Sequence, residues 1–360
     1  MEQIWRKVDP FEAQREALKA AKADKEAAAK TFASLAKLAF GQVANDYMAS
    51  ARKRLRRADE QSKIIDRDLR PAFADTPLQS ISAEDINEQL GKVGERSASA
   101  ALKAYVALRA IFAHAHKKHR KLFPVNASPF ADVDRPAAGG QRERHLEDKE
   151  IRLFWEATRV LGWPFGPIYQ LLLLTGTRLR EVAQGHWSEI NLEEKRWYLP
   201  GERTKNGKAH WVHLSPAAIA IIKDLPRVCK EDAPDFIFTT NGETPVSGFS
   251  RAKRRLDVAV AKILAADAED AGETTPKLNP FVIHDLRRTF ARGCQKLGYP
   301  PEIVERLLGH VTDTESGLKG VYQTYGFEPE RVEATNKWAD RVRRIVDGCS
   351  ARVVKLRGAA

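Results

Sequence analysis

One segment of the chain, residues 185–215, alternates aromatic and polar residues, and this pattern limits the folds that are possible. The segment, GHWSEINLEEKRWYLPGERTKNGKAHWVHLS, has turn residues near 191–195 and at Asn206-Gly207, as short antiparallel strands require. Most of the remaining sequence has helical periodicity. We therefore expect a mainly α fold with one small antiparallel β-sheet.

Two groups of helical segments are separated by a stretch that contains Pro136, Gly139 and Gly140 among charged residues. Such residues are typical of a linker. Residues 266–276 (ADAEDAGETTP) are acidic and predict a flexible insert. We expect a connecting helix in 1–36, a helical domain in 37–137, a linker in 138–145, a second domain in 146–347 and a tail in 348–360.

Two local patterns predict where helices begin. Ser82 and the acidic residue three positions later are typical of a capping box. In TGTRLREV, we expect Thr175 or Thr177 to cap a helix that begins near Arg178.

The charge balance favours an anionic partner. Sixty Lys and Arg residues against 48 Asp and Glu give a formal net charge of +12 and a pI near 9.5. A polyanion such as DNA releases counterions when its phosphates are neutralised. Basic clusters in the first domain are either a solvated face or DNA contacts, and the candidates are Arg52, Lys53, Arg54, Arg56, Arg57, Lys117, Lys118, Arg120 and Lys121.

The cysteines and hydropathy exclude several classes of protein. Cys229, Cys294 and Cys349 are far apart and form no CxxC pair, which argues against a disulfide framework or a zinc site. No run of 18 apolar residues is present, and residues 1–14 are charged and lack the apolar stretch that is typical of a signal peptide. We expect a cytoplasmic, nucleoid-associated bacterial protein that needs no metal and no cofactor.

Six residues spread over 145 positions are suited to chemistry on a phosphate. Four of them can hold phosphate oxygens, one is a phenol that can attack phosphorus, and one is a lysine that can protonate a leaving oxygen. In chain order they are Arg178, Lys205, His284, Arg287, His310 and Tyr322.

Neighbouring residues in the sequence support this assignment to phosphate chemistry. Arg178 and Glu181 are three residues apart, so the carboxylate can orient the guanidinium. At pH 7, forming the phenolate of a tyrosine costs roughly 4 kcal/mol, and nearby guanidiniums and an imidazole lower that cost. Tyr325, one turn after Tyr322, is a rival nucleophile on chemical grounds. Each of these residues, taken alone, is more often structural.

Together the motifs resemble the catalytic domain of the tyrosine recombinase (phage integrase) family, in particular its prophage and genomic-island integrases. The resemblance covers about residues 142–346, and residues 37–137 resemble the family's helical core-binding domain. The motifs are TGTRLREV, WSEIN, W-YLP, TKNGKAHWVHLS, IHDLRRTFA, LLGHVTDTESGLKGVYQTY and KWADRV.

The resemblance implies a site-specific DNA recombinase that integrates or excises a mobile element. Arg178, His284, Arg287 and His310 would hold the phosphate, and His284 would also help to deprotonate the nucleophile. Lys205 would act as general acid, Tyr322 would form a 3′-phosphotyrosyl ester, and Glu181 would support Arg178. The family exchanges strands through a Holliday junction in a tetramer on DNA, in places with DNA-bending accessory proteins.

Three questions remain open at this point, on the activity, the N-terminus and the segment after Tyr322. A catalytically idle DNA-binding relative is one alternative, although all six residues are present. A type IB topoisomerase-like strand relaxer is another, because it uses a similar set of residues, although the flanking motifs argue against it. Members of this subgroup usually carry an N-terminal arm-binding domain, so we expect either a truncation or a member without arm binding. The amphipathic segment after Tyr322 is expected to dock on a neighbouring protomer or to pack on its own domain.

Overall fold

The computed structural model describes residues 39–55, 57–118, 128–140, 142–309 and 326–348, with six separate residues between 15 and 25. The chain divides into two compact units, residues 1–141 and 142–360. This boundary lies inside the segment 138–145 that we expect to be a linker. No helix in the described ranges is both long and apolar enough to cross a membrane.

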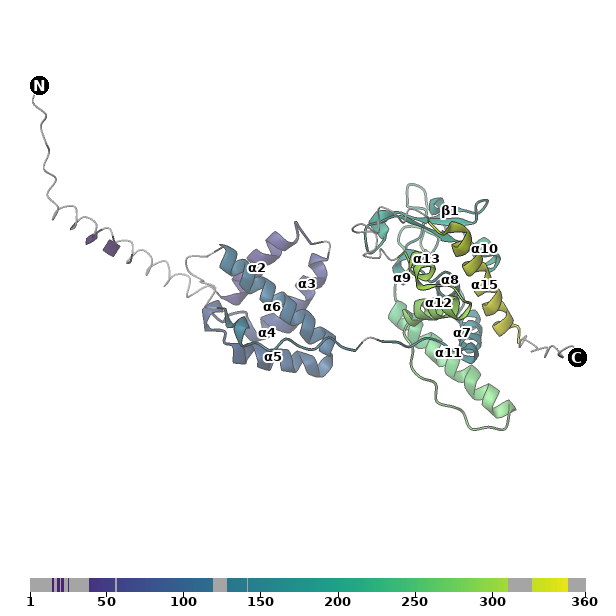
Figure 1. The fold of residues 1–360 in the computed structure, drawn as a ribbon, viewed down its shortest axis with the longest axis horizontal. Coiled ribbons are helices and arrows are strands. Elements are labelled where there is room, and N and C mark those ends of the chain that lie inside the picture. The colour runs from purple at the N-terminus through teal and green to yellow at the C-terminus, as the bar shows by residue number, and fades with distance from the viewer. Residues whose placement is uncertain are drawn as a thin grey trace, which may run out of the picture. The chain divides into compact units, whose positions relative to one another are not determined.

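The described part of the first unit is helical (Figure 1). Its buried side chains form one core that includes Phe40, Leu69, Ile86 and Leu108. The predicted capping box is confirmed, because Ser82 Oγ accepts from the Asp85 N–H at 3.1 Å and the Asp85 carboxylate accepts from the Ser82 N–H at 2.9 Å. The elements are α2 (Phe40–Ala51), α3 (Ala58–Ile64), a π-helical turn (Ile65–Leu69), α4 (Arg70–Phe73), α5 (Ala83–Arg96) and α6 (Ala98–Lys118).

The second unit combines helices with one three-stranded sheet, which confirms the predicted fold class. The sheet has the order β1-β2-β3 and is antiparallel throughout, with Trp197 opposite Val212. It lies at one end of the unit in Figure 1, with α11 at the other. The elements are α7 (Asp148–Leu161), α8 (Phe165–Thr175), α9 (Leu179–Ala183), β1 (Ile190–Asn191), β2 (Arg196–Leu199), β3 (His210–His213), α10 (Pro216–Lys223), α11 (Phe249–Asp270), α12 (Asp285–Lys296), α13 (Pro301–Leu307) and α15 (Glu328–Val346).

Helix α15 packs on its own unit, through side chains that reach α8 and α12. Trp338 is 1% exposed, and its indole N–H donates to the carbonyl oxygen of Leu173 in α8 at 2.8 Å. Its ring also meets Phe290 of α12 edge to face. Gly293 provides the space, because a Cβ there would lie 2.0 Å from the indole ring.

One local prediction about this unit was wrong. Helix α11 continues to Asp270, so the first part of the segment 266–276 is helical and not a flexible insert. Apolar residues of α11 remain buried as far as Ala268, and Asp267 forms an ion pair with Arg152 of α7. Burial and this ion pair offset the acidic composition, so the helix ends later than the composition suggests.

Candidate active site

Arg178 occupies the turn between α8 and α9. Helix α8 ends at Thr175, and Gly176 follows with a φ of +66°. A Cβ on Gly176 would lie 2.4 Å from the ring of Phe290, so α12 can approach this turn only because the residue is glycine. Arg178 is the residue that immediately precedes α9.

The threonines of this turn do not cap α9, contrary to our expectation. Thr175 Oγ1 instead contacts the Leu171 carbonyl oxygen and Thr177 Oγ1, each at 2.7 Å. A side chain of the helix itself provides a partner at the start of α9. Oε2 of Glu181 accepts from the backbone N–H of Arg178 at 2.9 Å. The carboxylate thus makes the contact that the N3 residue makes in a capping box, to the backbone N–H of the residue before the helix.

Glu181 also holds the side chain of Arg178. Its Oε1 accepts from Arg178 Nη1 at 2.7 Å, and the glutamate side chain is only 2% exposed. A buried carboxylate is costly unless it is paired and hydrogen-bonded. The pair therefore fixes the direction of the guanidinium, as the three-residue spacing predicts.

Arg287 lies in α12 and hydrogen-bonds the turn after α8 and the residue Leu308 after α13. The side chain is 5% exposed, and it donates from Nη1 to the Gly176 carbonyl oxygen at 2.6 Å and from Nη2 to the Leu308 carbonyl oxygen. These two carbonyls use two of the five N–H bonds of the guanidinium, so donors remain for a phosphate. Burial and then Arg178 lower the pKa of Arg287 to about 10, which indicates that the two guanidiniums are close neighbours.

His284 precedes α12 and lies near the same charges. The side chain reaches solvent, yet the protein around the ring, followed by Arg288 and Arg287, lowers its pKa. A lowered pKa keeps the imidazole neutral near pH 7, the form that can accept a proton.

The start of α12 is anchored by Asp285, which we did not single out from the sequence. Its carboxylate is fully buried, and it accepts from Arg142 Nε at 3.0 Å and from Arg288 Nη1 at 2.7 Å. It also accepts from the Val282 N–H at 2.8 Å, which closes the turn before His284. Arg142 lies inside the expected linker 138–145, so that segment contributes directly to the site.

Lys205 lies in the connection between β2 and β3, where the sequence predicts a hairpin, and it is exposed. Thr204 stabilises this connection. It is fully buried, and its single hydroxyl proton is shared between the Gly201 and Lys208 carbonyl oxygens, which lie 3.0 and 2.9 Å from Oγ1. Gly207, with a φ of +75°, completes the turn.

Two further hydrogen bonds connect this hairpin to α9, which follows Arg178, and to the residue Gly309 after α13. Arg203 Nη2 donates to the Glu181 carbonyl oxygen at 2.6 Å, and Asn206 Nδ2 donates to the Gly309 carbonyl oxygen at 3.0 Å. The sequence analysis missed both residues, although each lies within two positions of Lys205. The hairpin of Lys205, the turn of Arg178 and the end of α13 are therefore mutually connected.

His310, Tyr322 and the rival Tyr325 lie outside the described residues. Gly309, the last described residue before them, is held by Asn206, and Leu308 is held by Arg287. In the described part of the site, two guanidiniums, a neutral imidazole and an exposed lysine hairpin therefore converge. This arrangement suits a phosphodiester, whose charge the guanidiniums balance and whose departing oxygen a lysine can protonate.

Three of the described basic candidates of the first unit lie along a groove of about 660 Å³ between α2 and α6. Arg54, Lys117 and Lys118 line it, and Arg52, Lys53 and Arg57 are exposed nearby in the chain. Lys118 is paired with Asp46 at 2.6 Å, so part of its charge is balanced within the unit. Arg56, Arg120 and Lys121 lie outside the described residues.

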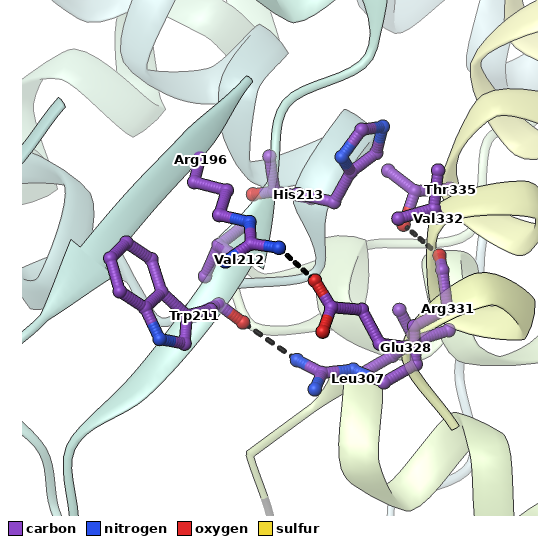
Figure 2. A pocket seen from close by; sticks show the side chains of 10 residues that line it. Arg196, Trp211, Val212, His213, Leu307, Glu328, Arg331, Val332 and Thr335 are labelled. Carbon is purple, nitrogen blue, oxygen red and sulfur yellow. Dashed lines mark hydrogen bonds and ion pairs between the residues drawn. The ribbon is translucent and has the colours of Figure 1, made fainter. Parts of the chain in front are cut away.

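A second cavity, of about 60 Å³, lies between the sheet and α15 and contains none of the predicted site residues (Figure 2). Arg196 of β2 pairs with Glu328, and Arg331 Nη2 donates to the Trp211 carbonyl oxygen at 2.7 Å. These contacts fasten α15 to the sheet, and we assign the cavity to packing.

Residues 144–316 match the sequence model of the phage integrase family. Prophage integrase IntA of Escherichia coli K12 is 23% identical over 296 residues, which cover 81% of this chain and 66% of IntA. A putative integrase/recombinase of Haemophilus influenzae is 28% identical over 175 residues, which cover 44% of this chain and 46% of that protein. The chain thus spans less than two thirds of the length of these relatives.

Solved structures share the fold. Lambda integrase in a dimer bound to a COC′ core site has a TM-score of 0.58 at 20% identity, covering 78% of this chain and 98% of that one. Lambda integrase in a tetramer bound to a Holliday junction has a TM-score of 0.55 at 17% identity, covering 87% and 84%. At these identities the likeness establishes the architecture of the chain.

Proposed function

Because residues 144–316 match the phage integrase family model, we propose that this chain is a site-specific DNA recombinase that cuts and rejoins strands through a tyrosine. The observation that supports this most is the arrangement of Arg178 and Arg287. Each guanidinium is held by hydrogen bonds to a buried partner, and each retains donors for a phosphate. Such preorganised charge stabilises a pentavalent phosphorus without further rearrangement.

In the proposed cleavage step, the phenol oxygen of Tyr322 attacks phosphorus. A bond forms between that oxygen and phosphorus, and the bond from phosphorus to the 5′-oxygen of the next nucleotide breaks. The product is a 3′-phosphotyrosyl ester and a free 5′-hydroxyl. The ester keeps the energy of the phosphodiester, so the 5′-hydroxyl of another duplex can reverse the step and join the strands.

Two proton transfers accompany this step. The imidazole of His284, which its lowered pKa keeps in the neutral form, accepts the phenol proton. Lys205 gives a proton to the departing 5′-oxygen, for which its exposed place on the hairpin is suited. His310 completes the phosphate contacts in this proposal, and Glu181 keeps Arg178 directed at the phosphate.

The proposed partner is double-stranded DNA with specific core sites. The basic groove of the first unit, with Arg54 and Lys117 exposed along it, supports a role in holding the DNA backbone. By analogy with lambda integrase, which has been solved as a tetramer on a Holliday junction, we propose that the chain assembles as a tetramer on DNA. Integration or excision of a mobile element is the proposed outcome.

A covalent trap tests this function. We would present a library of nicked duplexes with a randomised centre, in which the short 5′-hydroxyl fragment diffuses away after cleavage and leaves protein attached to DNA. Sequencing the attached DNA identifies a substrate, which is then used with defined variants. We expect Tyr322→Phe to abolish the covalent complex and to retain DNA binding in a gel-shift assay.

Tyr325→Phe is the matched control, and it should form the complex as the wild type does. Complex formation that persists in Tyr322→Phe and disappears in Tyr325→Phe would move the nucleophile to Tyr325. DNA binding without any covalent complex in the wild type would favour an idle DNA-binding relative. Relaxation of plasmid with no sequence preference and no strand exchange would favour a topoisomerase.

A further inference from the structure

His210, at the start of β3, lies five residues after Lys205 and faces the candidate active site. In β3, His210 and the buried Val212 share one face, while the exposed Trp211 shares the other with His213. Burial is the largest influence on the ring and lowers the pKa of His210, Glu181 opposes this, and Arg178 adds to it. The imidazole is therefore neutral at pH 7 and lies within electrostatic reach of the Arg178–Glu181 pair.

The ring nitrogen Nδ1 distinguishes His210 from an ordinary core residue. It is buried and has no hydrogen-bond partner among the residues that the structure describes. Leaving a buried polar atom unpaired costs about 1–3 kcal/mol. A phenylalanine would avoid that cost and could make the same ring contact, so the contact described next depends on the flat ring and not on the nitrogen.

The opposite edge of the ring packs on Gly309, the residue before His310. A Cβ on Gly309 would lie 2.7 Å from Nε2 and 2.8 Å from Cε1 of His210, which leaves room only for glycine. The φ of Gly309 is +59°, a conformation that also favours glycine. The same glycine accepts the hydrogen bond of Asn206, so the hairpin holds it both by packing and by a hydrogen bond.

We propose that His210 is a positioning residue of the active site. With Asn206, it locks the hairpin that carries Lys205 onto Gly309 and thereby fixes the residue that directly precedes His310 in the chain. The inference rests on the proposed function, because it assigns its importance to the reaction of Lys205 and His310. A flat, uncharged ring meets both demands of the position, since it packs closely on a glycine and adds no charge beside the two arginines.

The test measures the rate of covalent complex formation on the substrate selected above, at saturating DNA, and separately the affinity for that DNA. A misplacement of about 1 Å in a catalytic group can cost about 100-fold in rate. We expect His210→Ala to slow complex formation by about 10- to 100-fold with DNA affinity unchanged. His210→Phe keeps a flat ring and should retain most of the rate.

A double-mutant cycle isolates the contact with Gly309. Gly309→Ala is strained by its φ in any background, but it meets the imidazole only when His210 is present. We therefore expect Gly309→Ala to slow the wild type by a larger factor than it slows His210→Ala. Equal factors in the two backgrounds would overturn the proposal, as would a His210→Phe variant that is as slow as His210→Ala.

His213→Ala is the matched control, because His213 lies on the opposite face of β3 and contacts Asn336 of α15 at 3.3 Å. It should form the covalent complex at the wild-type rate. Circular dichroism of each variant checks that it is folded. A wild type that forms no complex contradicts the proposed function, whereas a wild type and a His210→Ala variant of equal rate contradict this inference alone.

Discussion

Arg287 donates a hydrogen bond of 2.6 Å to the carbonyl oxygen of Gly176, which lies 111 residues earlier in the chain. Its other terminal nitrogen donates to Leu308. The guanidinium that we expect to hold the phosphate therefore also fixes the turns that lead into Arg178 and His310. Binding and assembly of the site depend on the same side chain.

Arg287→Lys should consequently reduce both stability and catalysis. Lysine is a point charge that cannot reproduce the two-pronged donation, so at least one buried carbonyl loses its partner, at a cost of about 1–3 kcal/mol. We expect a lower midpoint of urea unfolding and no detectable covalent complex. Arg292→Lys, an exposed change in the same helix, should stay within about 0.5 kcal/mol of the wild type.

Glu181→Gln should weaken the orientation of Arg178. The glutamate is 2% exposed and accepts two hydrogen bonds from Arg178, so loss of its charge should cost about 1–3 kcal/mol of unfolding free energy and slow complex formation. Glu328→Gln is the control, because Glu328 also pairs with an arginine but is 59% exposed. Equal losses of stability in the two variants would contradict this account.

Gly293→Ala should destabilise the second unit, because the added methyl group would meet the indole ring of Trp338 at 2.0 Å. Overpacking of this kind costs about 1–3 kcal/mol. Gly91→Ala, inside α5, meets nothing within 4 Å and should instead stabilise the first unit by about 0.5–1 kcal/mol. Urea unfolding monitored by tryptophan fluorescence and circular dichroism measures both changes.

Mild acid should destabilise the second unit through His210 and His213. Burial is the largest cause that lowers the pKa of each, so the unfolded chain binds protons first as the pH falls through about 6.5. Stability is therefore fully present above that pH and declines below it, by at most about 1.4 kcal/mol per pH unit for each histidine. His213→Gln should flatten the decline measured by urea unfolding between about pH 7 and pH 5. An unchanged slope would contradict the assignment to His213.

The sequence was sufficient for the fold class and for the pairing of Arg178 with Glu181, because both follow from periodicity and spacing. It was not sufficient for the cap of α9. Thr175 and Thr177 are common capping residues, but Glu181 reaches the backbone of Arg178 from inside the helix. Local propensity cannot show which of two competing acceptors is nearer.

His210 and Asp285 were missed for a different reason. Their importance comes from residues distant in the chain, Gly309 for the first and Arg142 for the second. A usable signal was nevertheless present for His210, since it shares a strand face with Val212 and follows Lys205 closely. An imidazole on the inward face of a predicted hairpin is a candidate for the site that the hairpin serves.

The most direct test of the account is to identify the amino acid that carries DNA in the trapped complex. The complex is digested with a protease and a nuclease, and mass spectrometry locates the residue that bears the remaining nucleotide. The account predicts a phosphodiester link to the phenol oxygen of Tyr322. A nucleotide on any other residue, or cleaved DNA with no protein attached, would contradict it.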